Sequence, residues 1–221
     1  MYIELLIFIG VFLLSFYLSQ LIRIKIRNSL TADFSRHLLF FLPFLIPSII
    51  IGEPSFSHQI TDEIWLGYGI AILASFVGIM LQFKDFNVYL SKDIYYIIQP
   101  INLRRLIISC WTLIGSAFVE ELFYRDFLPG LVPSWPVAAQ ILMCSILFTL
   151  AHFLQPSTKK TFTIKTYMII FSLSLFWAIS IELTGSIIPA ILGHLIYNSP
   201  NLVITCLCYY LPRKYNSNYS I

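Results

Sequence analysis

Charge is the property that this sequence has least of. Only 14 Lys and Arg and 11 Asp and Glu occur among 221 residues, or 11% of the chain, whereas 58% of the residues are hydrophobic. A soluble domain of average composition is about a quarter charged, so no soluble fold of this size could bury so much apolar surface. The net charge of +3 is small and spread over predicted loops, which does not indicate nucleic acid as a partner. We therefore expect an all-α, polytopic membrane helix bundle with the lipid bilayer as its solvent.

Other absences narrow the class further. The chain has four cysteines, all inside apolar stretches, which favours reduced and inert thiols over disulfides or a Cys–metal site: Cys110, Cys144, Cys206 and Cys208. The first apolar stretch lacks a basic start and a small-residue cleavage site, so it predicts a membrane span and not a signal peptide. No internal repeat is visible, which argues against a transporter that relays protons through buried Glu and His.

Apolar stretches of roughly 20 residues predict membrane-spanning helices. We expect about seven spans in one membrane domain, 1–221, and one interfacial amphipathic segment, 84–105. The spans are 2–22, 38–51 (kinked by Pro43 and Pro47), 64–83, 106–126, 137–152 or slightly beyond, 166–181 and 187–211. Residues 52–63 form a polar loop, and the prolines from Pro129 onward end the fourth span.

Two further patterns concern packing and orientation. Small residues in the third span permit close helix packing: Gly67, Gly69, Ala71, Ala74, Ser75 and Gly78. Clusters of Lys and Arg follow the first span, precede the fourth, and follow the fifth and the seventh. Because short cytoplasmic loops carry the excess of basic residues, we expect the N-terminus outside and the C-terminus inside, in a bacterial cytoplasmic membrane.

The fourth predicted span contains two adjacent carboxylates and an arginine: Glu120, Glu121 and Arg125. Charge inside a membrane span is costly, so such residues indicate a functional site. Glu121 and Arg125 are four positions apart and can pair on one helix face. The bland alternative is a simple salt bridge, but such a pair leaves Glu120 about 100° round the helix without a partner. A carboxylate that no cation neutralises can act as a general base.

The remaining polar groups lie on two later spans. His152 ends the fifth span, where a lone histidine can equally be an interfacial side chain. His194 and Asn198 are four apart and share a face of the seventh span, where they could simply form hydrogen bonds between helices. Together with Glu120 they supply the parts for hydrolysing a peptide bond without a covalent intermediate, namely a base, a partner for the water and oxyanion donors.

A zinc site is the alternative chemistry for the same residues. Glu120, His152 and His194 could bind a zinc ion whose water is the nucleophile. The usual His-Glu-x-x-His helix of zinc proteases is absent, however. The residues alone leave both chemistries open.

Three short motifs resemble one known family. Glu120-Glu121-x-x-x-Arg125, Phe148-x-x-x-His152 and His194-x-x-x-Asn198, in this order, are similar to the motifs of the CAAX protease and bacteriocin-processing family, CPBP or Abi, of intramembrane proteases. The resemblance covers 106–211 and includes the type II CAAX prenyl endopeptidases, which remove the last three residues after a prenylated cysteine. Other members act on other peptides or confer bacteriocin self-immunity.

This resemblance implies a glutamate-type intramembrane endopeptidase that needs no metal cofactor and acts on a membrane-anchored peptide or protein. Glu120 would be the base, and His152 its partner on the water. His194 and Asn198 would form the oxyanion site, with Glu121, Arg125 and Phe148 in supporting roles. A non-catalytic immunity or partner protein of the membrane is the alternative function.

The predicted span limits conflict with this site. Straight helices over 106–126 and 137–152 place Glu120 toward the outer side and His152 near the cytoplasmic end. For the two to meet, residues 129–136 must dip back into the membrane or the limits must be wrong by several residues.

Overall fold

A computed structural model describes residues 2–25, 35–36, 38–51, 56, 63–159 and 161–215. Helices make up the regular structure of these residues, and no strand occurs among them. The predicted all-α membrane bundle is thereby confirmed. The predicted loop 52–63 lies outside the described residues apart from Phe56 and Glu63.

Within the described ranges, six helical stretches are long and apolar enough to cross a membrane. They are α1 (Tyr2–Lys25), α4 (Ile64–Leu81), α7 (Leu103–Glu121) with its continuation to Gly130, α9 (Val137–Leu154), α11 (Ile164–Thr184) and α12 (Ile188–Tyr215). The predicted span 38–51 is not among these six, and it contains the nine-residue helix α3 (Leu42–Ile50). Such a helix is about 13 Å long, less than half of a hydrocarbon core of roughly 30 Å.

The segment predicted as one interfacial helix is instead a series of short turns. It contains α5 (Phe83–Phe86), the 3-10 helix η1 (Asn87–Leu90) and α6 (Ile94–Ile97). An extended stretch then leads to Asn102, whose side-chain oxygen accepts a hydrogen bond from the backbone N–H of Arg105 and caps α7. A further short helix, α10 (Pro156–Lys159), follows α9.

The fourth span does not end at residue 126 as predicted. A π-helical segment, η2 (Leu122–Phe127), continues α7 into α8 (Leu128–Gly130). Pro129, which has no N–H to donate, lies at the end of this continuous helix, which stops one residue later at Gly130. Glu120 is therefore about 15 Å from the end of its span, and His152 about 22 Å from the start of α9. With the predicted limits, Glu120 would lie about 9 Å from the end of its span and His152 about 22 Å from the start of the next one. The longer fourth span therefore removes nearly half of the difference in depth between these two residues.

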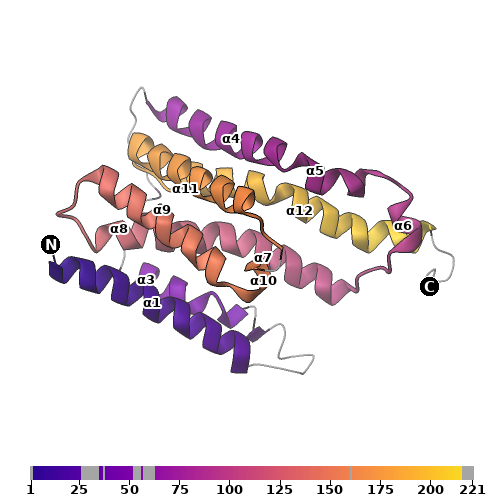
Figure 1. Cartoon of the computed structure of the whole chain (residues 1–221), viewed down its shortest axis with the longest axis horizontal. Coiled ribbons are helices and arrows are strands. Elements are labelled where there is room, and N and C mark those ends of the chain that lie inside the picture. The colour runs from indigo at the N-terminus through magenta and orange to yellow at the C-terminus, as the bar shows by residue number, and fades with distance from the viewer. Residues whose placement is uncertain are drawn as a thin grey trace.

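Figure 1 shows how the helices are layered. α4, α11 and α12 lie on one side, α7 and α9 in the middle, and α1 with α3 on the other side, with the two termini at opposite ends. α4 packs against α11 and α12, α12 packs against α7, and α3 packs against η2. The helices that carry the three motifs, α7, α9 and α12, thus all lie next to the centre of the bundle.

Close packing of α4 depends on its small residues. Gly67, Ala71, Ser75 and Gly78 are buried, as the pattern predicted, whereas Gly69 faces open space. A Cβ atom on Gly67 would lie 2.4 Å from Thr184 Cγ2 and 2.9 Å from the Ser180 carbonyl oxygen. Only glycine allows α4 and α11 to approach this closely.

Candidate active site

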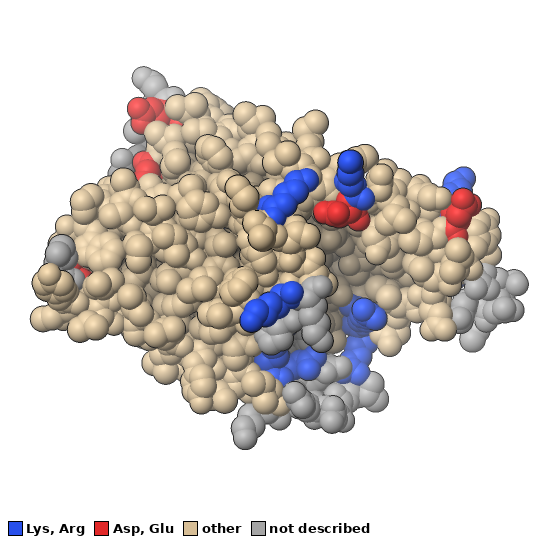
Figure 2. Space-filling model, in the orientation of Figure 1, with Lys and Arg blue, Asp and Glu red and all other residues tan. Residues whose placement is uncertain are grey.

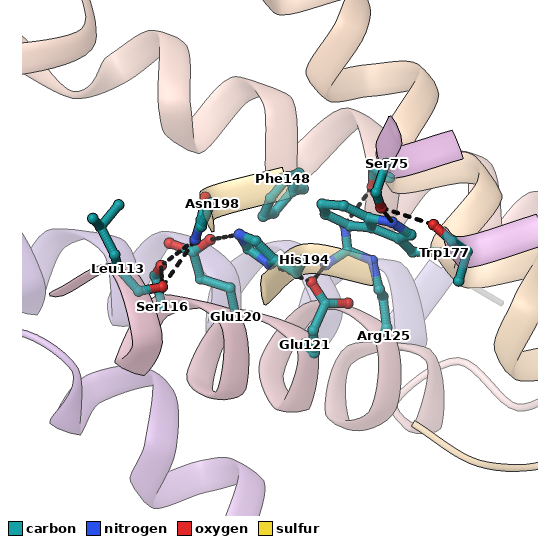
Figure 3. A network of polar contacts seen from close by, with 12 residues as sticks. Ser75, Leu113, Ser116, Glu120, Glu121, Arg125, Phe148, Trp177, His194 and Asn198 are labelled. Carbon is teal, nitrogen blue, oxygen red and sulfur yellow. Dashed lines mark hydrogen bonds and ion pairs between the residues drawn. The ribbon is translucent and has the colours of Figure 1, made fainter. Parts of the chain in front are cut away.

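The three motifs meet at one cavity. Glu120 comes from the end of α7, His152 from the end of α9, and His194 and Asn198 from α12. All four side chains line the same cavity of about 470 Å³. The sequence-predicted residues are therefore brought together at this cavity, and the longer fourth span accounts for nearly half of the predicted difference in depth. Figure 3 shows Glu120, His194 and Asn198 at this site.

Glu121 is the buried carboxylate of the pair. Its side chain has no exposed surface, and its Oε1 accepts hydrogen bonds from Arg125 Nη1 at 2.8 Å and from His194 Nδ1 at 2.7 Å. The predicted Glu121–Arg125 pair is thus present. The sequence did not indicate that the same Glu121 oxygen would also accept a hydrogen bond from His194.

Arg125 is enclosed by groups from two other helices, α9 and α11. Its Nη2 donates to Ser174 Oγ at 2.9 Å. Its guanidinium carbon lies 4.3 Å from the ring centre of Phe148 and 5.3 Å from that of Trp177. A buried guanidinium between aromatic faces is stabilised by cation–π attraction, so this cation is held as a structural part of the site.

His194 has a fixed ring orientation. The ring stacks on Trp177 with centroids 4.7 Å apart, and Trp177 Nε1 in turn donates to Ser75 Oγ at 3.1 Å. Because the Glu121 carboxylate can only accept, His194 Nδ1 carries the proton of that bond. His194 Nε2 then lies 3.9 Å from Glu120 Oε2, with a lone pair in the neutral form or an N–H in the charged form.

Glu120 faces the cavity. Its side chain is 16% exposed, whereas that of Glu121 is 0% exposed. The distance of 3.9 Å to His194 Nε2 is too long for a hydrogen bond. One carboxylate is therefore neutralised and buried, and the other is presented to the cavity, as Figure 3 shows.

His152 lies on the cavity wall contributed by α9. Its Nδ1 is 2.9 Å from the carbonyl oxygen of Phe148 in its own helix, so this nitrogen is the donor and Nε2 is left as the acceptor. The rings of Phe148 and His152 lie 4.6 Å apart. Among the described residues no ion pair or hydrogen bond joins His152 to Glu120, and the two are related only through the cavity that both line.

Asn198 is placed at the cavity but its amide hydrogens are engaged. Nδ2 donates to the Leu113 carbonyl oxygen at 2.9 Å and to Ser116 Oγ at 3.4 Å. The donors predicted for an oxyanion are therefore occupied in this arrangement, since His194 Nδ1 also donates to Glu121. A hydrogen bond to an oxyanion requires either a proton on His194 Nε2 or release of the Asn198 amide from Leu113 and Ser116 of α7.

Several residues of the site were not predicted. Trp177 and Ser174 hold His194 and Arg125, and their only sequence signal was their spacing of three on one face of an apolar helix. Ser75 was predicted as a packing residue and also accepts the Trp177 hydrogen bond. Tyr197 and Gln82 form a further polar pair on the cavity wall, with an O–H···O distance of 2.9 Å.

No group of three or more His, Cys, Asp or Glu in the described part of the chain is arranged to hold a metal ion. The zinc alternative thus has no ready ligand set there, and the absence of a cofactor stays a prediction.

Comparisons with known proteins bear on the same residues. A family model described as type II CAAX prenyl endopeptidase Rce1-like matches residues 102–200, which contain all three motifs. This match confirms the family resemblance that the motifs predicted. Neither the curated proteins nor the solved structures gave a match.

Proposed function

We propose that this chain is an intramembrane protease of the CAAX type, as the match of residues 102–200 to the Rce1-like family model supports. In the proposed mechanism, a water molecule activated by Glu120 hydrolyses a peptide bond within the membrane. The substrate is a membrane-associated peptide or protein. One observation carries the proposal, namely that Glu120 lies on the cavity while its neighbour Glu121 is buried and neutralised.

The chemistry assigned to the site needs no covalent intermediate. Glu120 takes a proton from water as the resulting hydroxide attacks the carbonyl carbon, and the carbonyl oxygen becomes an oxyanion. His152 Nε2, which faces away from its own helix carbonyl, accepts a hydrogen bond from the water and orients it. The proton then passes from Glu120 to the leaving nitrogen, and the carbon–nitrogen bond breaks to give a carboxylic acid and an amine.

The oxyanion is assigned to His194, with Asn198 beside it. Glu121 fixes the His194 ring through Nδ1, so a proton on Nε2 makes the imidazolium a donor toward the cavity. Arg125 offsets the charge of Glu121 in the same buried cluster. Asn198 contributes only when its amide leaves Leu113 and Ser116.

The bilayer is the proposed setting, with the N-terminus outside and the C-terminus in the cytoplasm of a bacterial cell membrane. In support, the Lys and Arg side chains visible in Figure 2 gather on the half of the molecule away from the N-terminus. Glu120 and the polar cavity residues of α9 and α12 would then be reached from the cytoplasmic side.

A cleavage assay tests the proposal. The protein, reconstituted in liposomes, is incubated with degenerate peptide pools, and new termini are read by mass spectrometry. Wild type and Glu182→Gln, which removes an exposed carboxylate of α11 outside the cavity, are expected to cleave. Glu120→Gln is expected to be inactive while keeping its thermal unfolding transition. Equal cleavage by Glu120→Gln would contradict the base assignment, and absence of cleavage by wild type would favour a non-catalytic partner protein.

A further inference from the structure

Gln82 is a buried polar side chain on the cavity wall that the proposed mechanism does not use. It directly follows α4, is 8% exposed and lines the same cavity as Glu120. The floor of this cavity is formed by Glu120, Trp177 and His194, and Gln82 lies away from it. Burial of a side-chain amide is costly unless its polar atoms have hydrogen-bond partners. The partners of Gln82 therefore indicate what this part of the wall can bind.

Tyr197 fixes the orientation of the Gln82 amide. Its hydroxyl donates to Gln82 Oε1 at 2.9 Å, and its ring contacts Trp177 with centroids 6.2 Å apart. Because the amide oxygen accepts this proton, the amide nitrogen points away from Tyr197. Among the described residues no acceptor is bonded to Gln82 Nε2, and this atom is not one of the fully enclosed ones. The Gln82 amide therefore offers unused N–H groups in the cavity wall.

The helices give the distance of this amide from the floor. Trp177 stacks on His194 and donates to Ser75 Oγ, so Ser75 marks the level of the floor on α4. Gln82 follows Ser75 by seven residues, and Tyr197 follows His194 by three. At 1.5 Å per residue these separations are about 10 Å and 5 Å. An extended peptide rises about 3.3 Å per residue, so the Gln82 amide lies about two or three substrate residues from the floor.

A peptide carbonyl oxygen is the acceptor that fits this position. A substrate segment that reaches Glu120 must be extended around the scissile bond, and its carbonyl groups then lose their partners within a helix. An unpaired carbonyl inside a membrane or a protein costs free energy. A neutral amide donor satisfies one such carbonyl whatever the substrate side chain is. Asp85, which lines the same wall, disfavours an anionic acceptor through its negative charge.

We propose that Gln82 Nε2 donates a hydrogen bond to a backbone carbonyl oxygen of the substrate, two or three residues from the scissile bond. Tyr197 is a positioning residue in this subsite, because it holds the amide oxygen and so directs the nitrogen. This inference rests on the proposed function, since it takes the floor around Glu120 as the place of cleavage. The contact holds an extended peptide in register with Glu120 without selecting its side chains.

A binding measurement tests the subsite without turnover. Glu120→Gln protein in lipid nanodiscs is incubated with a degenerate decapeptide pool, and the most strongly retained peptide is identified by mass spectrometry. This decapeptide is then synthesised as a series in which sulfur, a weaker acceptor, replaces one carbonyl oxygen at a time. A thioamide at the position that Gln82 binds is expected to raise the Kd about 3–10-fold, as for loss of one hydrogen bond. A Kd that no thioamide changes would overturn the inference.

Variants in the Glu120→Gln background assign the sensitive position to Gln82. Gln82→Met removes the donor, so it is expected to raise the Kd of the all-oxygen peptide about 3–10-fold and to abolish the further effect of that one thioamide. Gln99→Met is the matched control, because Gln99 is an exposed glutamine that does not line the cavity, and it should keep the thioamide effect. A thioamide effect that is the same with Gln82→Met at every position would overturn the inference.

Tyr197→Phe tests the positioning role with a smaller change. Without the hydroxyl the Gln82 amide can rotate, so the thioamide effect at the sensitive position is expected to shrink while the effects at other positions stay the same. A role of Tyr197 in stability alone would change the Kd of the whole series equally. An unchanged thioamide effect in Tyr197→Phe would overturn the positioning of Gln82 by Tyr197. Thermal unfolding midpoints of all variants are recorded in the same nanodiscs.

Cleavage of the same series by the protein with Glu120 intact separates this inference from the proposed function. The sensitive thioamide is expected two or three residues from the cleaved bond and should lower kcat/KM about 3–10-fold, unless Gln82 is already replaced by Met. Cleavage that needs Glu120 but shows no thioamide effect dependent on Gln82 would leave the proposed function and overturn the subsite. A thioamide effect on binding that depends on Gln82, without any cleavage, would keep the carbonyl contact and overturn the protease mechanism.

Discussion

Replacing Glu121 by Gln tests the buried ionic cluster at the centre of the bundle. Gln is close to Glu in shape, and its oxygen can still accept from Arg125 and His194. The negative charge is lost, however, and Arg125 is left with uncharged partners: the new amide oxygen, the Ser174 hydroxyl and the rings of Phe148 and Trp177. Breaking a buried ion pair by removing one partner costs about 3–5 kcal/mol. That is a large part of a typical unfolding free energy of about 5–15 kcal/mol.

Removing the arginine of the pair and keeping the carboxylate should lower the unfolding free energy by less. After Arg125→Met, the Glu121 carboxylate still accepts a hydrogen bond from His194 Nδ1, at 2.7 Å in the present structure. The double variant Glu121→Gln with Arg125→Met has no buried charge in the pair. We expect it to be more stable than Glu121→Gln alone, since an apolar replacement of a whole buried pair is often nearly neutral.

Unfolding in detergent with a thiol-reactive dye measures these differences, because Cys144 is buried and becomes accessible on unfolding. Glu182→Gln, an exposed carboxylate of α11, is the matched control and should change the unfolding free energy little. A loss of less than about 1 kcal/mol for Glu121→Gln, or a double variant less stable than both single variants, would refute the reasoning.

Three further predictions follow from contacts and chemistry. Gly193→Ala should destabilise the protein by about 1–3 kcal/mol, because the new Cβ would lie 2.6 Å from Trp177 Nε1. Gly69→Ala is the control, because a Cβ at Gly69 has open space around it. Equal midpoints of thermal unfolding for the two variants would contradict this prediction. His152→Ala should lower the cleavage rate by about 10²-fold or more at unchanged stability, and an unchanged rate would remove His152 from the mechanism. Dialysis against a chelator should leave cleavage unchanged, and a loss that zinc restores would favour the metal alternative.

Much of the fold was predictable because the bilayer leaves few choices. Long apolar stretches must become helices, since lipid cannot satisfy backbone hydrogen bonds. The limits were predicted less well where local signals misled. Pro129 suggested an end at residue 126, but the helix continues through the π-helical segment η2 and ends at Gly130. The stretch 38–51 is apolar enough for a span, but its helix has only nine residues.

The site was predictable where it depends on spacing within one helix. The Glu121–Arg125 pair follows from a separation of four, and the structure contains it. Contacts between helices could not be predicted in the same way, because they depend on how α7, α11 and α12 rotate against one another. The bond from His194 to Glu121 and the stacking of His194 on Trp177 are of this kind. The hydrogen bond from Asn198 to the Leu113 carbonyl oxygen is another contact of this kind. The oxyanion role of Asn198 stays a prediction.

The central claim is that the Glu120 carboxylate is the base. Its most direct test compares the cleavage rates of Glu120→Gln and Glu120→Asp on one peptide identified from the pools. Gln keeps the size but removes the base, so kcat/KM should fall by about 10²–10⁴-fold. Asp keeps the carboxylate at a shorter reach, so part of the rate should remain. If both variants lose the same activity, or if Gln cleaves as fast as Asp, Glu120 does not act as the base.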